Sequence, residues 1–199
     1  MSHILKNGEA INLSKDLTNL TVGVGWDPIE QAPSTEPLDL DVYAILMADN
    51  DSEKNEMVNY AAKQSKCGSI RLSKDNITGE GDGDDEQLWF TLNTVAENIK
   101  EVDVWIVIYK AKSLGQSFSN VKGAHCRLFQ GIDGKEEENG HLASFDISVG
   151  DSNVQSIHAA TLFRQGESWS FRCVEKGYEL DHEGVPELYN LPSAEKVTE

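Results

Sequence analysis

The sequence predicts an all-β protein, a two-sheet β-sandwich with a few short helices. Apolar and polar residues alternate with a period of two over many short segments, as expected of strands with one buried face. Glycine, asparagine and aspartate turn signals separate these segments. Hydrophobic residues make up 39% of the 199 residues, which together with the glycines is enough for one core. We therefore expect a single sandwich domain over residues 1–192 and a polar C-terminal tail over residues 193–199.

The first half of the chain contains four strand candidates. Residues 9–13 show a weak alternating pattern, and residues 20–26 alternate leucine and valine with threonine and glycine. Residues 40–46 place leucine, valine and alanine on one face, and residues 88–92 place leucine and phenylalanine opposite tryptophan and threonine. Residues 28–37 hold three of the five prolines, which predicts a loop between two strands.

The second half contains five further strand candidates and two helical ones. Residues 102–109 are a β-branched and aromatic run interrupted by Asp103, which predicts a strand buried on both faces. Gln165-Gly166-Glu167 predicts a hairpin between the last two strands. The other predicted strands are residues 124–130, 143–147, 157–164 and 168–174. Helical patterns are short, and we expect them at residues 94–99 and 185–191.

The charge of the chain excludes several classes of partner. Seventeen basic residues against 34 acidic ones give a net charge of −17, which argues against nucleic acid as a partner and against unaided docking to an anionic membrane. No apolar run approaches the roughly 20 residues of a membrane span, and residues 1–10 lack the apolar stretch of a secretory signal. Three scattered cysteines without a CxxC pair suit a reducing compartment, where we expect each to be a small residue buried in a strand. These features predict a cytoplasmic protein without direct membrane insertion.

The segment from Asp75 to Glu86 is the most informative part of the sequence. Six of its twelve residues are carboxylates, three are glycines and none is basic. The glycines allow the backbone to fold back sharply, and crowded carboxylates repel one another unless a cation lies between them. Many hard oxygen ligands in a flexible loop favour Ca²⁺ over Mg²⁺. The order of residues does not fit an EF-hand, and a solvated acidic turn that binds nothing stays open as the alternative.

Further acidic residues precede this segment. Asp39 and Asp41 are two residues apart on one strand, so they share a face. Asp27 follows Trp26 at the end of the preceding strand. If that strand pairs near Asp39, three more acids meet at one end of the sandwich, although an ordinary exposed strand face would also explain Asp39 and Asp41.

Six motifs follow one another along the chain. They are Leu20-Thr21-Val22-Gly23-Val24-Gly25-Trp26-Asp27, Asp39-Leu40-Asp41, the acidic segment 75–86, Gly115-Gln116-Ser117-Phe118-Ser119-Asn120-Val121, Trp169-Ser170-Phe171-Arg172 and Gly177-Tyr178. In this order they resemble the tellurium-resistance TerD family, and the resemblance covers roughly residues 10 to 180. The chain departs from the family pattern in the longer segment from Pro28 to Pro37 and in the sequence that follows Tyr178, which would fit a divergent paralogue.

The resemblance implies a TerD-like, calcium-binding β-sandwich in the cytoplasm. Family members are linked to resistance to tellurite, phage and colicins. We expect Ca²⁺ as two ions, and we expect action through protein partners, namely other tellurite-resistance proteins, which could be membrane-associated. The positions that match the family's calcium ligands are Asp27, Asp39, Asp41, Asp75, Asn76, Glu80, Asp82, Asp84, Asp85 and Glu86.

The sequence does not predict a catalytic residue. It contains no GxSxG, P-loop or HExxH motif, and its five histidines lack metal-ligand spacing. We therefore predict a non-enzymatic stress-response protein. Two alternatives remain at this point. One is a hydrolase that uses the same acidic cluster around Mg²⁺ or Mn²⁺, and the other is a structural domain in which calcium only stabilises the fold.

Overall fold

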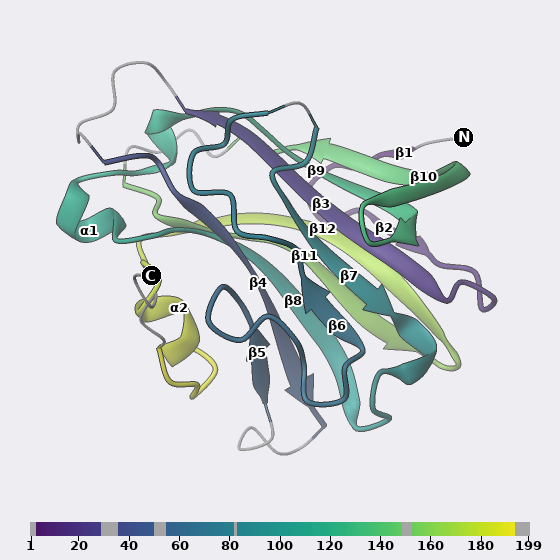
Figure 1. Cartoon of the computed structure of the whole chain (residues 1–199). Helices are drawn as coiled ribbons and strands as arrows, with labels where there is room; N and C mark the ends of the chain where they lie inside the picture. The colour runs from purple at the N-terminus through teal and green to yellow at the C-terminus, as the bar shows by residue number, and fades with distance from the viewer. Residues whose placement is uncertain (1–2, 29–35, 50–54, 82, 149–152, 194–199) are drawn as a thin grey trace.

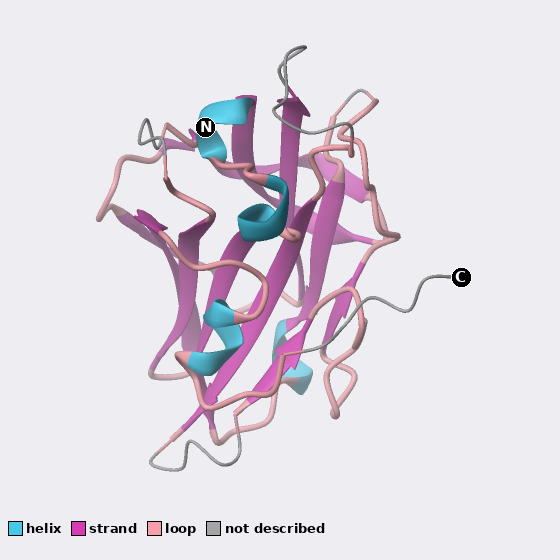
Figure 2. Ribbon diagram, turned by 90° about the vertical axis from the view of Figure 1, so that its left-hand side faces the viewer, coloured by secondary structure: helices cyan, strands magenta, loops and turns pink. Residues whose placement is uncertain are grey.

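The structure is a computed structural model, and it describes residues 3–28, 36–49, 55–81, 83–148 and 153–193. Two six-stranded sheets pack face to face, with short helices outside them (Figure 1). The predicted all-β sandwich is therefore confirmed, and Figure 2 shows how little of the chain is helical. The boundary at residue 192 stays a prediction, because the tail over residues 194–199 lies outside the described residues.

The first sheet combines the strand before the proline-rich segment with the strand after the acidic loop. In spatial order its strands are β1 (His3–Ile4), β10 (Lys135–Asp146), β9 (Val121–Ile132), β3 (Asn19–Pro28), β7 (Glu86–Thr91) and β6 (Ile70–Leu72). β3 is antiparallel to β7 on one side and to β9 on the other. β1 pairs with β10 in parallel.

The second sheet is antiparallel throughout. In spatial order its strands are β2 (Ala10–Asn12), β12 (Ser168–Tyr178), β11 (Ser156–Gln165), β8 (Ile99–Ile108), β4 (Leu40–Ala48) and β5 (Glu56–Val58). The predicted hairpin at Gly166 joins β11 to β12, with Gln165 opposite Ser168. β5 covers just part of β4, since it pairs with Ala44, Ile45 and Leu46.

The main core lies between the two sheets. The alternation predicted from the sequence turns Val22 and Val24 of β3 and Leu40 and Val42 of β4 inward, and all four are fully buried. Such side chains contribute about 1.5–3 kcal/mol each on burial. Cys126 and Cys173 are buried in strands, as expected, whereas Cys67 is exposed outside them.

A second apolar cluster lies on the opposite face of the second sheet. Tyr43 and Trp105 on that face are almost fully buried, because the C-terminal segment with α2 (Gly184–Glu187) packs over them. β8 is accordingly buried on both faces, as its continuous apolar run predicts. In a simple sandwich, the faces of β4 and β8 that point away from the main core would be exposed to solvent, but here they are buried.

The helix predictions are partly wrong. The helix predicted for residues 94–99 does not form: Thr94 is the last residue of the 3-10 helix η2 (Leu92–Thr94), and Ile99 is the first residue of β8. The chain must enter β8 directly, so strand pairing overrides the local helical pattern. The C-terminal helix is α2 alone, followed by turns.

Other elements were not expected from the sequence. Their local patterns are too short to stand out, and neighbouring strands supply the partners that make them form. Among the residues that the structure describes, no helix has the length and apolar character needed to cross a membrane. The unexpected elements are β1, β5, β6, α1 (Ala111–Leu114) and η3 (Phe118–Asn120).

Candidate metal centre

The acidic loop joins β6 to β7 and lies against β3. The backbone N–H of Asp85 donates to the carbonyl of Val24 at 2.9 Å. A Cβ atom at Gly23 would overlap the Asp84 carboxylate, and one at Gly25 would overlap the carbonyl of Gly83 and the ring of His125. The two glycines of β3 are therefore required because the loop backbone and its side chains approach the strand too closely for any larger residue.

Three carboxylates from two separate segments meet beside this loop. Asp39 precedes β4, Asp41 lies within it and Asp75 belongs to the acidic loop; one oxygen of each lies within 4.8 Å of the others. Asp41 has no exposed surface at all. Three negative charges at this spacing, one of them fully buried, repel strongly, because the local dielectric is low. The arrangement favours a divalent cation bound between them.

Glu86, at the start of β7, interacts with two of these three carboxylates, Asp41 and Asp75. It is 1% exposed and accepts a hydrogen bond of 2.8 Å from the backbone N–H of Val42, on a part of β4 that β5 does not cover. Burial, followed by the negative charges of Asp41 and Asp75, raises the pKa of Glu86 well above its usual range. A cation beside it would offset both effects and keep the carboxylate ionised.

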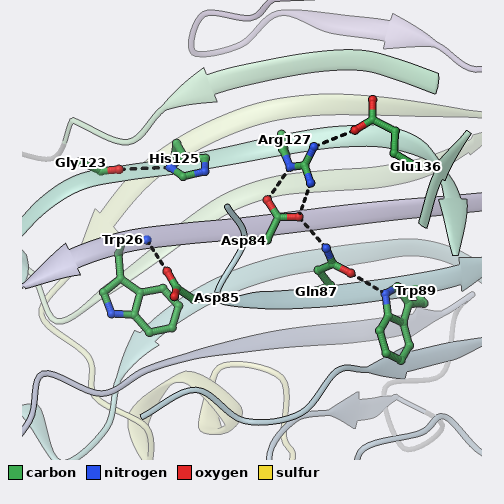
Figure 3. Close-up of polar contacts among 9 residues, drawn as sticks. All are labelled: Trp26, Asp84, Asp85, Gln87, Trp89, Gly123, His125, Arg127 and Glu136. Atoms are coloured by element: carbon green, nitrogen blue, oxygen red, sulfur yellow. Dashed lines mark hydrogen bonds and ion pairs between the residues drawn. The ribbon is translucent and has the colours of Figure 1, made fainter. Parts of the chain in front are cut away.

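A second group of polar residues lies where β3 ends. Asp85 accepts hydrogen bonds from the Trp26 backbone N–H at 2.8 Å and from the Asn76 amide at 2.7 Å (Figure 3 shows the first). Burial first, then the charges of Asp27 and Asp84, raises the pKa of Asp85. Asp27 itself is exposed. Asp27 and Asp85 thus interact with each other, and neither belongs to the group formed by Asp39, Asp41 and Asp75.

Asp84 does not belong to the group of Asp39, Asp41 and Asp75, and it has a basic partner. Its carboxylate forms a two-pronged ion pair with Arg127 at 2.5 and 2.9 Å and accepts a bond of 2.6 Å from Gln87. Arg127 also pairs with Glu136 at 2.8 Å (Figure 3). The Asp84 side chain is fully buried, so this contact fastens the acidic loop to the face of the first sheet.

The remaining positions of the acidic loop shape the turn. The Asn76 side-chain oxygen accepts the backbone N–H groups of Thr78 and Gly79, both at 3.2 Å, as in an Asx-turn. Glu80 is exposed, and Asp82 lies outside the described residues. The contacts of Arg127 and Gln87 with Asp84 were not predicted as part of this site. Both residues lie in strands, and a basic or amide side chain in a strand beside an acidic loop could have indicated such contacts.

The donor set fits calcium. Asp39, Asp41, Asp75 and Glu86 offer hard carboxylate oxygens, and none of these four positions is a nitrogen or sulfur ligand. Hard oxygens select Ca²⁺, Mg²⁺ or Mn²⁺ over softer metals. Calcium takes about 6–8 oxygens in flexible geometry, and such a loop can supply them together with carbonyls and water.

Comparison with known proteins places the chain in a family. The TerD domain model matches residues 1–189. The tellurium resistance protein TerD of Serratia marcescens is 32% identical over 183 residues, which cover 89% of this chain and 92% of that protein. General stress protein 16U of Bacillus subtilis is 30% identical over 90% of this chain and 92% of its own length.

Solved structures agree with the fold. A crystal structure of protein SAV2460, of unknown function, matches with a TM-score of 0.67 and 25% identity over 83% of this chain and 92% of that one. A TerD homologue, SCO6318 of Streptomyces coelicolor, matches with a TM-score of 0.64 and 22% identity over the same shares. With the family match spanning nearly its whole length, the chain belongs to the TerD family.

Proposed function

We propose that this protein is a calcium-binding, non-enzymatic stress-response protein that acts through protein partners in the cytoplasm. The observation that carries the proposal is the convergence of Asp39, Asp41 and Asp75 within 4.8 Å, beside the buried Glu86. Residues 34 or more positions apart in the sequence meet there, which a solvated acidic turn would not require. The names of the relatives, which refer to tellurium resistance and general stress, support the stress-response part.

In this proposal, calcium binding controls the function of the protein. The first ion would be held by Asp39, Asp41 and Asp75, with Glu86 next to them. The second would lie near Asp27 and Asp85. Bound calcium would neutralise the repulsion within the acidic loop and set its conformation, so that partners meet a different surface in the loaded protein. Those partners are expected to be other tellurite-resistance proteins.

Isothermal titration calorimetry on chelator-treated protein tests the metal part. We expect Ca²⁺ to bind more tightly than Mg²⁺, and Asp75→Asn to weaken calcium binding by about tenfold or more, because a ligand charge is lost. Asp146→Asn, an exposed carboxylate on β10, is the matched control and should change nothing. Equal affinities for the two ions would count against the calcium proposal.

Two further measurements test the rest. Turnover of a panel of phosphoesters with Mg²⁺ or Mn²⁺ would replace the non-enzymatic proposal with the hydrolase alternative. In cells that lack the gene, wild-type protein should restore stress tolerance better than the Asp75→Asn variant does at equal abundance. Equal rescue by both would separate the biological role from calcium.

A further inference from the structure

A cavity of about 630 Å³ opens next to the candidate metal centre. Asp39 belongs to both, since its carboxylate is one of the three that converge and the residue also lines the cavity. Ile77 of the acidic loop, Tyr109 and Leu114 provide apolar walls, and Lys110 provides a cation. This size lies within the range of about 300–1,000 Å³ that is typical of sites for small organic molecules.

Lys110 is held in a strained backbone conformation. Its φ is 53°, in the left-handed region that residues with a Cβ seldom occupy. Its N–H donates to His182 Nδ1 at 3.3 Å, and its carbonyl accepts the Ser113 hydroxyl and the Leu114 N–H at 3.0 Å each. Strain that the surroundings maintain in this way is a feature of binding sites.

Lys110 lines the cavity, and its ammonium group has no ionic partner among the residues that the structure describes. It lies 5.2 Å from the centre of the Tyr109 ring. The Tyr109 backbone N–H in turn donates to the carbonyl of Asp39 at 2.9 Å. Lys110 is thereby connected through the backbone of its neighbour Tyr109 to Asp39, and both Lys110 and Asp39 line the cavity.

We infer that this cavity binds a phosphate monoester with an apolar body when calcium is bound. The inference rests on the calcium function proposed above. A calcium ion at Asp39, Asp41 and Asp75 takes about 6–8 oxygens, so part of them would come from water, which an oxygen of a ligand could replace. A phosphate monoester carries close to two negative charges near neutral pH, so its oxygens can bridge the ion and the Lys110 ammonium while its apolar part contacts Ile77.

Binding depends on calcium for an electrostatic reason. Without the ion, the carboxylates of Asp39 and Glu36 at the cavity repel an anion. With the ion present, its two positive charges offset most of the negative charge of the three carboxylates and give an anion a cation to bind beside Asp39. The ion would also hold the loop that carries Ile77 at Asp75. Calcium would therefore act as a switch for the binding of an anionic ligand.

Titration with phenyl phosphate, monitored by calorimetry, tests the inference. We expect binding to the calcium-loaded protein, none after EGTA treatment, and at least about tenfold weaker binding by Lys110→Met, with calcium affinity preserved. Lys112→Met, on the exposed side of α1, is the matched control and should bind both calcium and phenyl phosphate normally.

The failures of the two proposals are distinguishable. If calcium binds but phenyl phosphate does not, or if phenol or benzylamine binds as well as phenyl phosphate, the cavity inference is wrong and the calcium proposal stands. If calcium itself does not bind, both are wrong. Binding of phenyl phosphate that persists in EGTA would also overturn the inference.

Vesicles distinguish the source of the phosphate. Calcium-dependent and Lys110-dependent sedimentation with phosphatidic acid vesicles, but not with phosphatidylcholine vesicles, would assign the site to a lipid headgroup. Binding of phenyl phosphate without sedimentation would assign it to a soluble monoester.

Discussion

The hydroxyl of Tyr189 donates a hydrogen bond of 2.7 Å to Oδ2 of Asp103, across 86 residues of the chain. Asp103 lies on β8 and is 4% exposed, and its other oxygen accepts the hydroxyl of Thr161 at 2.7 Å and lies 3.0 Å from His158 Nε2. The indole N–H of Trp105 donates to the Tyr189 hydroxyl at 2.9 Å. A buried carboxylate thus joins the C-terminal segment to the second sheet.

Tyr189→Phe should lower the free energy of unfolding by about 1.5–3 kcal/mol, because Asp103 loses a donor to a charged group. That corresponds to a fall in melting temperature of roughly 3–10 °C for a chain of this length. Urea denaturation measures the change. In an Asp103→Asn background the same substitution should cost less; an unchanged cost would show that the hydroxyl stabilises the protein in another way.

The stabilisation by Asp103 should depend on pH. Burial by itself would raise the pKa of Asp103, but hydrogen bonds from His158, Thr161 and Tyr189 outweigh it, and the pKa is lowered. A lowered folded-state pKa stabilises the protein above the unfolded value near 3.9, and this stabilisation is lost as the pH falls through the folded-state pKa. The difference in unfolding free energy between wild type and Asp103→Asn should therefore shrink below about pH 4. A difference that stays constant down to acid pH would contradict this prediction.

Gly23→Ala should displace the acidic loop, because the added Cβ would overlap the Asp84 carboxylate. Gly23 does not have a positive φ, so the cost comes from the contact and not from the backbone. We expect a loss of about 1–3 kcal/mol together with weaker calcium binding, measured by urea denaturation and calorimetry. Adding Gly23→Ala to Asp84→Ala should cost little more, since the overlapping group is then absent.

Arg127→Met should destabilise the protein by about 3 kcal/mol, because it leaves the buried Asp84 carboxylate without its guanidinium partner. Glu136→Gln is the matched comparison: it removes the outer, partly exposed ion pair of the same arginine, and should cost no more than about 1 kcal/mol. Thermal melts of both variants measure and compare the two losses of stability. Equal losses would mean that the inner pair does not fasten the loop.

Calcium removal should lower the melting temperature of the wild-type protein. A ligand at a hundredfold excess over its Kd stabilises the folded form by about 2.7 kcal/mol, or roughly 5–10 °C for a chain of this length. EGTA should reverse the shift, added calcium should restore it, and Asp39→Ala should reduce it. Coincident melts in EGTA and in calcium would show that the ion does not stabilise this fold.

Much of the fold was predictable because its signal is local. The alternation in residues 20–26 and 40–46 became β3 and β4 with the predicted inward faces. Gln165-Gly166-Glu167 formed the hairpin between β11 and β12. The helix expected at residues 94–99 did not form, because helical propensity over six residues is weak compared with the pairing of β8.

The candidate site was less predictable. The sequence identified the acidic loop and the pair Asp39 and Asp41, and the structure brings Asp75 to that pair. Asp27 lies beside Asp85 instead, and Asp84 is bound to Arg127. All of these are carboxylates in similar sequence surroundings, so composition could not assign them different partners.

By itself the sequence determined the long strands, the acidic loop and the glycines within that loop, because these follow from side-chain periodicity and local backbone freedom. The tertiary structure alone decided that Asp41 is buried, that Asp84 fastens the loop and that the C-terminal segment covers β8. These outcomes depend on which strands pair and in which register. Register is set by the packing of residues far apart in the chain, so no window of sequence contains it.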